Sequence, residues 1–216
     1  MSIVLFGASG NIGSNIRKEA LSRRHRVTAV TRAANLQPEP NLTTLHADIS
    51  NVDDVARIVS GHDAVISAYS PGLRNYSAED AAELIRKAHD SLFAGVKRAG
   101  VKRLIIVGGV GSLEASPGVD VVDSDFYPAG HKAHTLRNRE ILRSLKRSEH
   151  DLDWSYVSPP LNIKPGERTG VFRLGGDRLL RDAVGESAIS EADFAVAIID
   201  ALENSTHIRQ RFTVAY

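Results

Sequence analysis

The chain has 216 residues, of which 42% are hydrophobic and 25% are charged, and its formal net charge is +1. These values are typical of one globular domain, and the small net charge provides no electrostatic basis for binding nucleic acid or an acidic membrane surface. The absence of cysteine excludes disulfides, thiolate metal sites and a catalytic thiol. No stretch approaches the roughly 18 to 20 apolar residues of a membrane span. With no signal peptide at the N-terminus, we expect a cytoplasmic protein.

Apolar runs alternate with helical patterns along most of the chain. Strands are predicted at residues 3–6, 27–30, 42–46, 64–67, 104–107 and 154–157. Helices are predicted at residues 11–24, 52–60, 78–99 and about 132–146. Strands that alternate with helices indicate a parallel sheet covered on both faces. The sequence therefore predicts an α/β fold with a Rossmann-type doubly wound parallel sheet.

Three glycines lie between the first strand and the first helix, at Gly7, Gly10 and Gly13. In this position the first glycine permits a tight turn, the second lets backbone approach a phosphate, and the third lets the helix pack on the strand. The helix N-terminus then faces the anion. The pattern predicts a dinucleotide cradle. Its expected residues are Gly7, Ala8, Ser9, Gly10, Asn11, Ile12 and Gly13.

The end of the second strand bears on the choice of cofactor. A carboxylate about 20 residues past the glycines would bind the ribose 2′-hydroxyl and favour NAD(H). Here Thr31 and Arg32 occupy this place, with no carboxylate before Glu39. An arginine can pair with a 2′-phosphate, so we expect NADP(H) to be preferred over NAD(H). The alternative is that Arg32 is an ordinary solvated loop cation.

Ligands of doubly wound sheets bind outside the carboxyl ends of the strands, which supplies further candidates. After the third strand, Asp48 could contact adenine or could equally cap the following helix. Residues 109–129 carry turn residues, and a loop of this length is often a lid. The further cofactor-binding candidates at strand ends are Asp48, Ile49, Ser67, Ala68, Tyr69, Gly108, Gly109 and Pro159.

The alternation of apolar runs with helical patterns changes after residue 157. We expect residues 159–216 to add a small substrate-side lobe to one domain that spans residues 1–216. The lobe would contain a helix at residues 190–203, with Ser190 as N-cap, and a closing strand at residues 212–215. Arg168 is either a loop cation or a contact for a substrate anion.

Several ordered segments carry a resemblance to a known family. Gly-Ala-Ser-Gly-Asn-Ile-Gly at 7–13 is followed by Val-Thr-Arg at 30–32, Leu-Ile-Ile-Val-Gly-Gly-Val-Gly-Ser-Leu at 104–113, Pro-Gly-Glu-Arg-Thr-Gly at 165–170 and Arg-Phe-Thr-Val at 211–214. Over its whole length, the chain resembles atypical short-chain dehydrogenase/reductases. It is most similar to the NAD(P)H-binding group of NADH-flavin reductases, biliverdin-IXβ/flavin reductases and NmrA-like regulators. The resemblance implies that Pro159 shapes a nicotinamide pocket; the alternative is that it only ends a strand.

The catalytic residues of that family are only partly matched. Typical short-chain dehydrogenases use a tyrosine, a lysine four positions later and a serine, but no tyrosine here has a lysine at that offset. Where many flavin-reductase-like members have Tyr-Lys, this chain has His131 and Lys132, and Ser112 is the nearest hydroxyl to the serine position. His131 is therefore a candidate proton donor, or else a helix-start residue bonded to a carbonyl.

Other conspicuous side chains have simpler interpretations. His131 and His134 have a chelating spacing, but no third ligand is evident, so no metal is expected. Trp154 and Tyr156 alternate on a strand and are expected to pack in the core.

Two classes of function follow from these residues. The first is an NAD(P)H-dependent oxidoreductase that reduces a planar small molecule such as a flavin or quinone, because such acceptors require little beyond orientation. The second is a catalytically silent NADP(H) sensor of NmrA-like type that signals to a regulatory protein partner. An epimerase or dehydratase of nucleotide sugars is a third interpretation. Besides a complex with a regulatory protein partner, the assembly that we expect is a homodimer.

Overall fold

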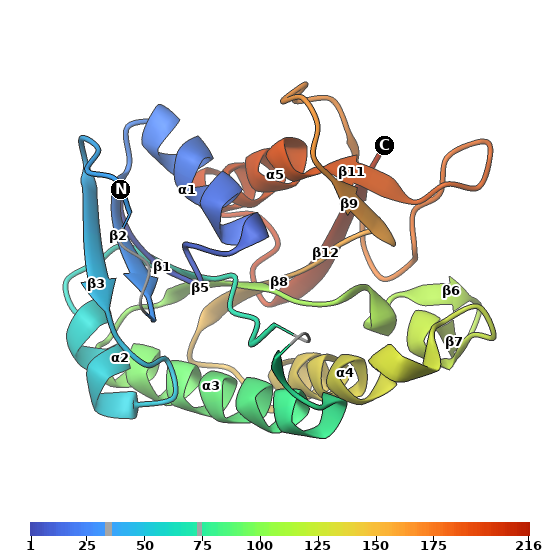
Figure 1. The fold of residues 1–216 in the computed structure, drawn as a ribbon, viewed down its shortest axis with the longest axis horizontal. Helices are drawn as coiled ribbons and strands as arrows, with labels where there is room; N and C mark the ends of the chain where they lie inside the picture. Colours follow the sequence, from blue (N-terminus) through green and yellow to red (C-terminus); the bar gives the residue numbers. More distant parts are fainter. Residues whose placement is uncertain (33–35, 73–74) are drawn as a thin grey trace.

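One eight-stranded sheet forms the centre of the protein, with helices on both of its faces (Figure 1). The structure, a computed structural model, describes residues 1–32, 36–72 and 75–216. The strand order is β10-β12-β8-β5-β4-β1-β2-β3, and every neighbouring pair is parallel except β10 with β12. The strands are β1 (Ser2–Phe6), β2 (Arg26–Thr31), β3 (Leu42–His46), β4 (Ala64–Ser67), β5 (Arg103–Val107), β8 (Asp153–Ser158), β10 (Arg173–Gly175) and β12 (Gln210–Ala215). This topology confirms the predicted doubly wound fold.

In the described part of the chain, five α-helices cover the sheet in two layers (Figure 1). On one face lie α1 (Asn11–Ser22) and α5 (Glu191–Glu203), and on the other lie α2 (Val52–Val59), α3 (Ala78–Arg98) and α4 (Lys132–Ser148). Each face buries its own apolar cluster. The strands supply both clusters because successive side chains point to opposite faces. Among the described residues, no helix is both long and apolar enough to cross a membrane.

The strand register places the carboxyl ends of the central strands side by side. Phe6 of β1 pairs with Val30 of β2 on one side and with Ser67 of β4 on the other. Ser67 in turn pairs with Ile106 of β5. Residues that follow these strands therefore gather at one edge of the sheet, as expected for a ligand site in this fold.

Residues 109–129 form short elements in place of the expected irregular loop. They contain two short 3-10 helices, η2 (Val110–Ser112) and η3 (Val121–Asp123), and a hairpin of β6 (Glu114–Ser116) and β7 (Val119–Asp120). A further 3-10 turn, η4 (Ala129–His131), leads into α4. Leu113, Val121 and Val122 are fully buried. The segment is packed because these apolar side chains, hidden among turn residues in the sequence, enter the interior.

The C-terminal part of the chain is joined more closely to the main layers than the expected lobe. The helix at residues 190–203 is present, with the Ser190 side chain as its N-cap, as predicted. It packs beside α1, however, and the last strand lies inside the sheet between β8 and β10. The apolar faces of α5 and β12 explain this, since both are almost entirely buried. Outside the main sheet, β9 (Asn162–Lys164) and β11 (Ala188–Ser190) form a separate parallel pair.

Candidate functional site

The turn after β1 has the backbone geometry predicted from its glycines. Gly7 has a φ of 76°, in the left-handed region, and the Gly10 amide donates to the Gly7 carbonyl over 3.0 Å. A Cβ atom on Gly7 would lie 2.5 Å from the Ala68 carbonyl oxygen, and one on Gly13 would lie 2.0 Å from the Gly7 oxygen. Both distances are too short for any side chain. The turn, the end of β4 and the helix can therefore meet only because these positions are glycine.

The N-terminus of α1 offers backbone donors to an anion. The first hydrogen bond within the helix runs from the Ser14 amide to the Gly10 carbonyl, 2.9 Å away. The amides of Asn11, Ile12 and Gly13 precede that bond and have no carbonyl partner within the helix. The first turn of α1 contains no acidic residue. These amides and the positive end of the helix dipole are the kind of group that binds an anion.

A cavity of about 400 Å³ opens over this turn at the carboxyl edge of the sheet. Its lining consists of Phe6, Gly7, Ser9, Gly10, Asn11, Ile12, Val30, Thr31, Arg32, Ala47, Ile49, Ala68, Tyr69, Ser70 and Gly72. The cofactor residues predicted from sequence that line it are Gly7, Ser9, Gly10, Asn11, Ile12, Arg32, Ile49, Ala68 and Tyr69. The structure thus gathers residues from the ends of four strands, β1, β2, β3 and β4, around one space.

Three other predicted residues lie beneath the cavity. Ala8 is fully buried in the apolar cluster below α1, and Ser67 is buried as the last residue of β4. Gly13 lies against the carbonyl of Gly7. These three residues lie under the glycine turn, whereas their neighbours in the sequence line the cavity.

Three predicted residues lie beyond the cavity, after β5 and β8. Pro159 directly follows β8, and Gly108 and Gly109 directly follow β5, whose neighbour is β4. A Cβ atom on Gly108 would lie 2.0 Å from the ring of Tyr156. The buried Tyr156 ring therefore fills the space that a serine side chain at position 108 would need. This ring packs in the core, as expected, and burial raises the pKa of its phenol.

A second hollow adjoins the cavity at the end of β3. Its lining is Arg32, His46, Ala47, Asp48, Ser50, Tyr69, Tyr76 and Leu84. Arg32, Ala47 and Tyr69 line both spaces. Burial raises the pKa of Tyr69, against the opposing effect of the Arg32 charge. Arg32 itself is exposed and stands where the two spaces meet.

Asp48 does not cap the next helix, which was one of its two expected roles. The N-cap of α2 is Asn51, whose side chain accepts from the amides of Asp53 and Asp54. Asp48 lies three residues earlier, and its carboxylate accepts from the Ser50 amide over 2.9 Å. Because Asn51 is the residue within reach of the helix amides, Asp48 is left at the rim of the second hollow.

Ser112 is not in the position expected of a substrate-binding serine. It is buried in η2, and its carbonyl and hydroxyl accept from Arg211 of β12 at 2.6 and 3.3 Å. Arg211 also donates to Asp177. The Ser112 hydroxyl therefore serves an internal contact between η2 and the sheet.

His131 and Lys132 stand at the start of α4. His131 is exposed and is the N-cap residue, but its side chain makes no capping hydrogen bond. Its ring meets the ring of His134 edge to face, with the centroids 5.8 Å apart. The described residues that line the glycine cavity do not include His131, Lys132 or Ser112. His131 and Lys132 are neighbours in the chain and Ser112 lies in η2, and the structure does not place these three candidates in the described lining of that cavity. Within the described part of the chain, no metal-binding cluster includes His131 and His134.

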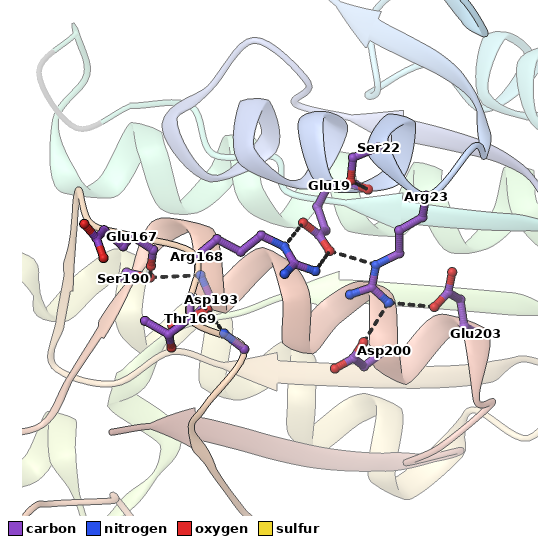
Figure 2. A network of polar contacts seen from close by, with 11 residues as sticks. Glu19, Ser22, Arg23, Glu167, Arg168, Thr169, Ser190, Asp193, Asp200 and Glu203 are labelled. Carbon is purple, nitrogen blue, oxygen red and sulfur yellow. Dashed lines mark hydrogen bonds and ion pairs between the residues drawn. The ribbon is translucent and has the colours of Figure 1, made fainter.

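The segment 165–170 is tied to the two helices that lie under the cradle (Figure 2). Arg168 forms two hydrogen bonds of 2.8 Å with the carboxylate of Glu19 in α1. The carboxylate of Asp193 in α5 accepts from the amides of Thr169 and Gly170 at 2.8 and 2.7 Å. Of its two expected roles, Arg168 has that of a loop cation, and its partner is Glu19.

Arg23 and His25, which follow the end of α1, have a structural role. Arg23 donates to Glu19 at 2.7 Å, to Asp200 at 2.7 Å and to Glu203 at 2.6 Å (Figure 2). His25 also contacts Glu203. These ion pairs join the C-terminal end of α1 to that of α5.

Glu191 is a residue of this region that sequence reasoning missed. Its carboxylate accepts from the side-chain amide of Asn11 at 2.5 Å and from that of Asn15 at 3.1 Å. Asn11 lines the cavity, so Glu191 fixes one of its walls. The helix-start pattern could place Glu191 in the first turn of α5, but no local signal connects it with a residue 180 positions earlier.

Comparisons with known proteins agree with this geometry. Residues 7–205 match the model of a family described as NAD(P)H-binding. Three of the solved structures that are similar to the chain illustrate this. A protein of Burkholderia pseudomallei proposed to be exported is 41% identical over 100% of both chains, with a TM-score of 0.86. A proposed epimerase of Bacteroides thetaiotaomicron is 39% identical over 100% of this chain and 96% of its own, with a TM-score of 0.90. A proposed NADH-flavin reductase of Streptococcus pneumoniae is 29% identical over 100% and 99%, with a TM-score of 0.80.

Proposed function

The chain belongs to the NAD(P)H-binding family, and from that premise we propose that it is an NADPH-preferring oxidoreductase that reduces a planar acceptor such as a quinone or flavin. The observation that carries the proposal is the cavity over the glycine turn, with Arg32 at its adenosine end. Its chemistry fits a dinucleotide because unpaired helix amides, glycine backbone and apolar walls occur together.

Different residues of the cavity would hold successive parts of such a cofactor. The amides of Asn11, Ile12 and Gly13 would hold the pyrophosphate. Ile49 and Tyr69 would pack on the adenosine, and the backbone after β4 would lead toward the end of β5. A bound nicotinamide cofactor supplies a hydride. The task left to the protein is to orient the ring and the acceptor and to exclude water.

The preference for NADPH rests on Arg32 and on the absence of a carboxylate from the described lining of the glycine cavity. Arginine binds a phosphate dianion through charge-assisted hydrogen bonds. We therefore expect Arg32→Ala to raise the dissociation constant of NADPH about ten- to a hundredfold while changing that of NADH by less than about threefold. Arg147→Ala, an exposed arginine at the end of α4, is the matched control. Equal affinities for the two cofactors in the wild-type protein would contradict the preference.

Reduction of a planar acceptor is the reaction that the site supports best. The described lining of the cavity contains no Tyr-Lys pair. The residue after β5, at which a substrate-binding serine would stand, is Gly108. Transfer to a flavin or quinone depends mainly on ring orientation. NADPH oxidation measured against FMN, riboflavin and a set of quinones tests this. Acceptor-dependent turnover supports the proposal, and no turnover with any of them contradicts it.

One observation favours a second candidate, an NADP(H) sensor. The Ser112 hydroxyl, the nearest to the family serine position, is occupied by Arg211. A sensor would bind both oxidised and reduced cofactor without consuming either and would act through a protein partner. Tight NADPH binding without turnover across the acceptor panel would favour it.

An epimerase is a third candidate because of the Bacteroides neighbour that bears this description. An epimerase returns its hydride to the substrate, so it would produce no net NADPH oxidation with a quinone or flavin. The same acceptor panel therefore separates it from the reductase.

We also propose that the protein works in the cytoplasm, where NADPH consumed by a reductase is regenerated. The Burkholderia neighbour is itself proposed to be exported, so the compartment needs a direct test. Cell fractionation with an antibody against the chain would provide it, and recovery outside the cytoplasm would contradict this proposal.

A further inference from the structure

The N-terminal half of α4 lies against the backbone that follows β5. A Cβ atom on Gly111 would meet the Thr135 side chain at 1.9 Å, and one on Gly109 would meet that of Asn138 at 3.7 Å. Thr135 and Asn138 are one turn apart and share a face of the helix. This helix face therefore lies at the end of β5, and β5 neighbours β4, whose end lines the glycine cavity.

Three side chains form a hydrogen-bonded chain on this part of α4. The Tyr127 hydroxyl lies 2.7 Å from the Thr135 Oγ1 atom, which lies 3.3 Å from Nε2 of His134. Tyr127 is partly exposed, whereas Thr135 is buried. Nδ1 of His134 is buried and has no hydrogen-bond partner among the described residues. The chain therefore runs from a half-buried imidazole through a buried hydroxyl to a phenol that solvent can contact.

The unpartnered nitrogen sets the direction of these hydrogen bonds. A proton on Nδ1 would be a buried donor without an acceptor, which costs about 1–3 kcal/mol. A neutral His134 therefore carries its proton on Nε2 and donates to Thr135. The Thr135 hydroxyl then donates to Tyr127, and the phenolic proton is left to point away from the helix.

The charge state of His134 agrees with this arrangement. Burial, with a smaller contribution from the nearby His131, lowers its pKa below the ordinary value. This direction favours the neutral ring, which has a single proton to place.

We propose that Tyr127, held by Thr135 and His134, donates a proton to a carbonyl oxygen of the acceptor, and that the natural acceptor is therefore a quinone or another conjugated carbonyl compound. This inference rests on the proposed function. His134 and Thr135 are positioning residues that act through Tyr127. They differ from a Tyr-Lys pair because the support for the phenol is a neutral chain of donors, and no lysine lies four residues after Tyr127.

The reaction balances without a further reactant. The acceptor gains a hydride at one end of its conjugated system, and its carbonyl oxygen takes the Tyr127 proton as the electron pair moves onto that oxygen. The resulting phenolate accepts the hydrogen bond from Thr135 and regains a proton from water. The sum is one NADPH, one proton and one acceptor converted to NADP⁺ and reduced acceptor. A flavin has no such requirement, since it can take the hydride at a ring nitrogen.

The first test compares two acceptors in the same variants. Tyr127→Phe should lower kcat with a quinone about a hundredfold and change kcat with FMN by less than threefold, with NADPH affinity unchanged. Thr135→Val should lower kcat with the quinone about tenfold, and Thr135→Ser should restore it. The control Tyr216→Phe, which also loses a hydrogen-bonded hydroxyl, should keep the wild-type ratio of the two activities.

The second test does not depend on turnover. Nitrogen NMR of histidine-labelled, cofactor-free protein at neutral pH, with the His134 signal assigned through His134→Gln, should show the proton of the neutral ring on Nε2. A proton on Nδ1 would overturn the inference. So would quinone turnover that Tyr127→Phe leaves unchanged, or a loss confined to His131→Ala, which would assign the proton donor to His131. In contrast, wild-type protein that oxidises no NADPH with any acceptor contradicts the proposed function itself.

Discussion

Arg168 and Glu19, 149 residues apart, meet through two parallel hydrogen bonds of 2.8 Å. Glu19 is only 6% exposed, and its helix begins at the glycine turn, so the ion pair fixes the segment 165–170 on the back of the cradle helix. The hydrogen bonds from Arg168 are the main cause of the lowered pKa of Glu19. The strength of this link decides how firmly the C-terminal part of the chain is held.

We expect the two partners to contribute unequally to stability. Glu19→Gln removes a buried carboxylate that serves both Arg168 and Arg23, and should lower the free energy of unfolding by about 2 kcal/mol. Arg168→Ala leaves Glu19 paired with Arg23 and removes an arginine that is half exposed, so it should cost about 1 kcal/mol or less. Urea unfolding of both variants measures this. Equal losses, or a larger loss for Arg168→Ala, would contradict the assignment of Glu19 as the centre of the network.

A second anchor of the same segment predicts a dependence of stability on pH. Burial tends to raise the pKa of Asp193, but the donors Thr169, Gly170 and Tyr216 outweigh it and lower the pKa overall. A carboxylate with a lowered folded-state pKa stabilises the protein fully above its unfolded value, about 3.9, and loses that contribution as the pH falls through the lower folded value. The stability difference between the wild-type protein and Asp193→Asn should therefore be constant above about pH 5 and shrink below about pH 4. The exposed Glu79→Gln is the control, and a difference that grows on acidification would contradict the sign.

The packing of the cradle makes a sharp prediction for Gly13. Its replacement by alanine places a Cβ atom 2.0 Å from the Gly7 carbonyl, so helix α1 and the turn must separate. We expect Gly13→Ala to abolish measurable NADPH binding and to lower the free energy of unfolding by about 1–3 kcal/mol. Gly176→Ala, where no atom lies within 4 Å of the added Cβ, should preserve both properties. Calorimetric titration with NADPH and thermal unfolding give the two readouts; normal NADPH affinity in Gly13→Ala would contradict the proposed cradle.

The local parts of the fold and cradle could be predicted from sequence because their causes lie close together in the chain. Gly7, Gly10 and Gly13 stand between an apolar strand and an amphipathic helix, and Ser190 precedes a helix that it caps. Such signals depend on steric and hydrogen-bonding rules within a few residues. They indicated the doubly wound sheet and most of the cavity lining.

The remaining features depend on contacts between distant segments. Nothing near Ser112 indicates that Arg211 of the last strand would occupy it. The cap of α2 is a different case, because Asn51, a residue type preferred at the N-cap, directly precedes that helix in the sequence. The buried apolar residues after β5 are likewise hidden among turn residues. The hydrogen bonds that join His134, Thr135 and Tyr127 depend on the path that the backbone takes into α4, which no local pattern indicates.

The most direct test of the central claim is a single-turnover reaction of the protein with NADPH and a quinone, run in parallel with NADPH deuterated at the transferred position. The account predicts that the NADPH absorbance disappears only when the quinone is present, and that deuteration slows this step severalfold. NADPH that binds tightly but keeps its absorbance with quinones and flavins alike would contradict the account and would favour an NADP(H) sensor.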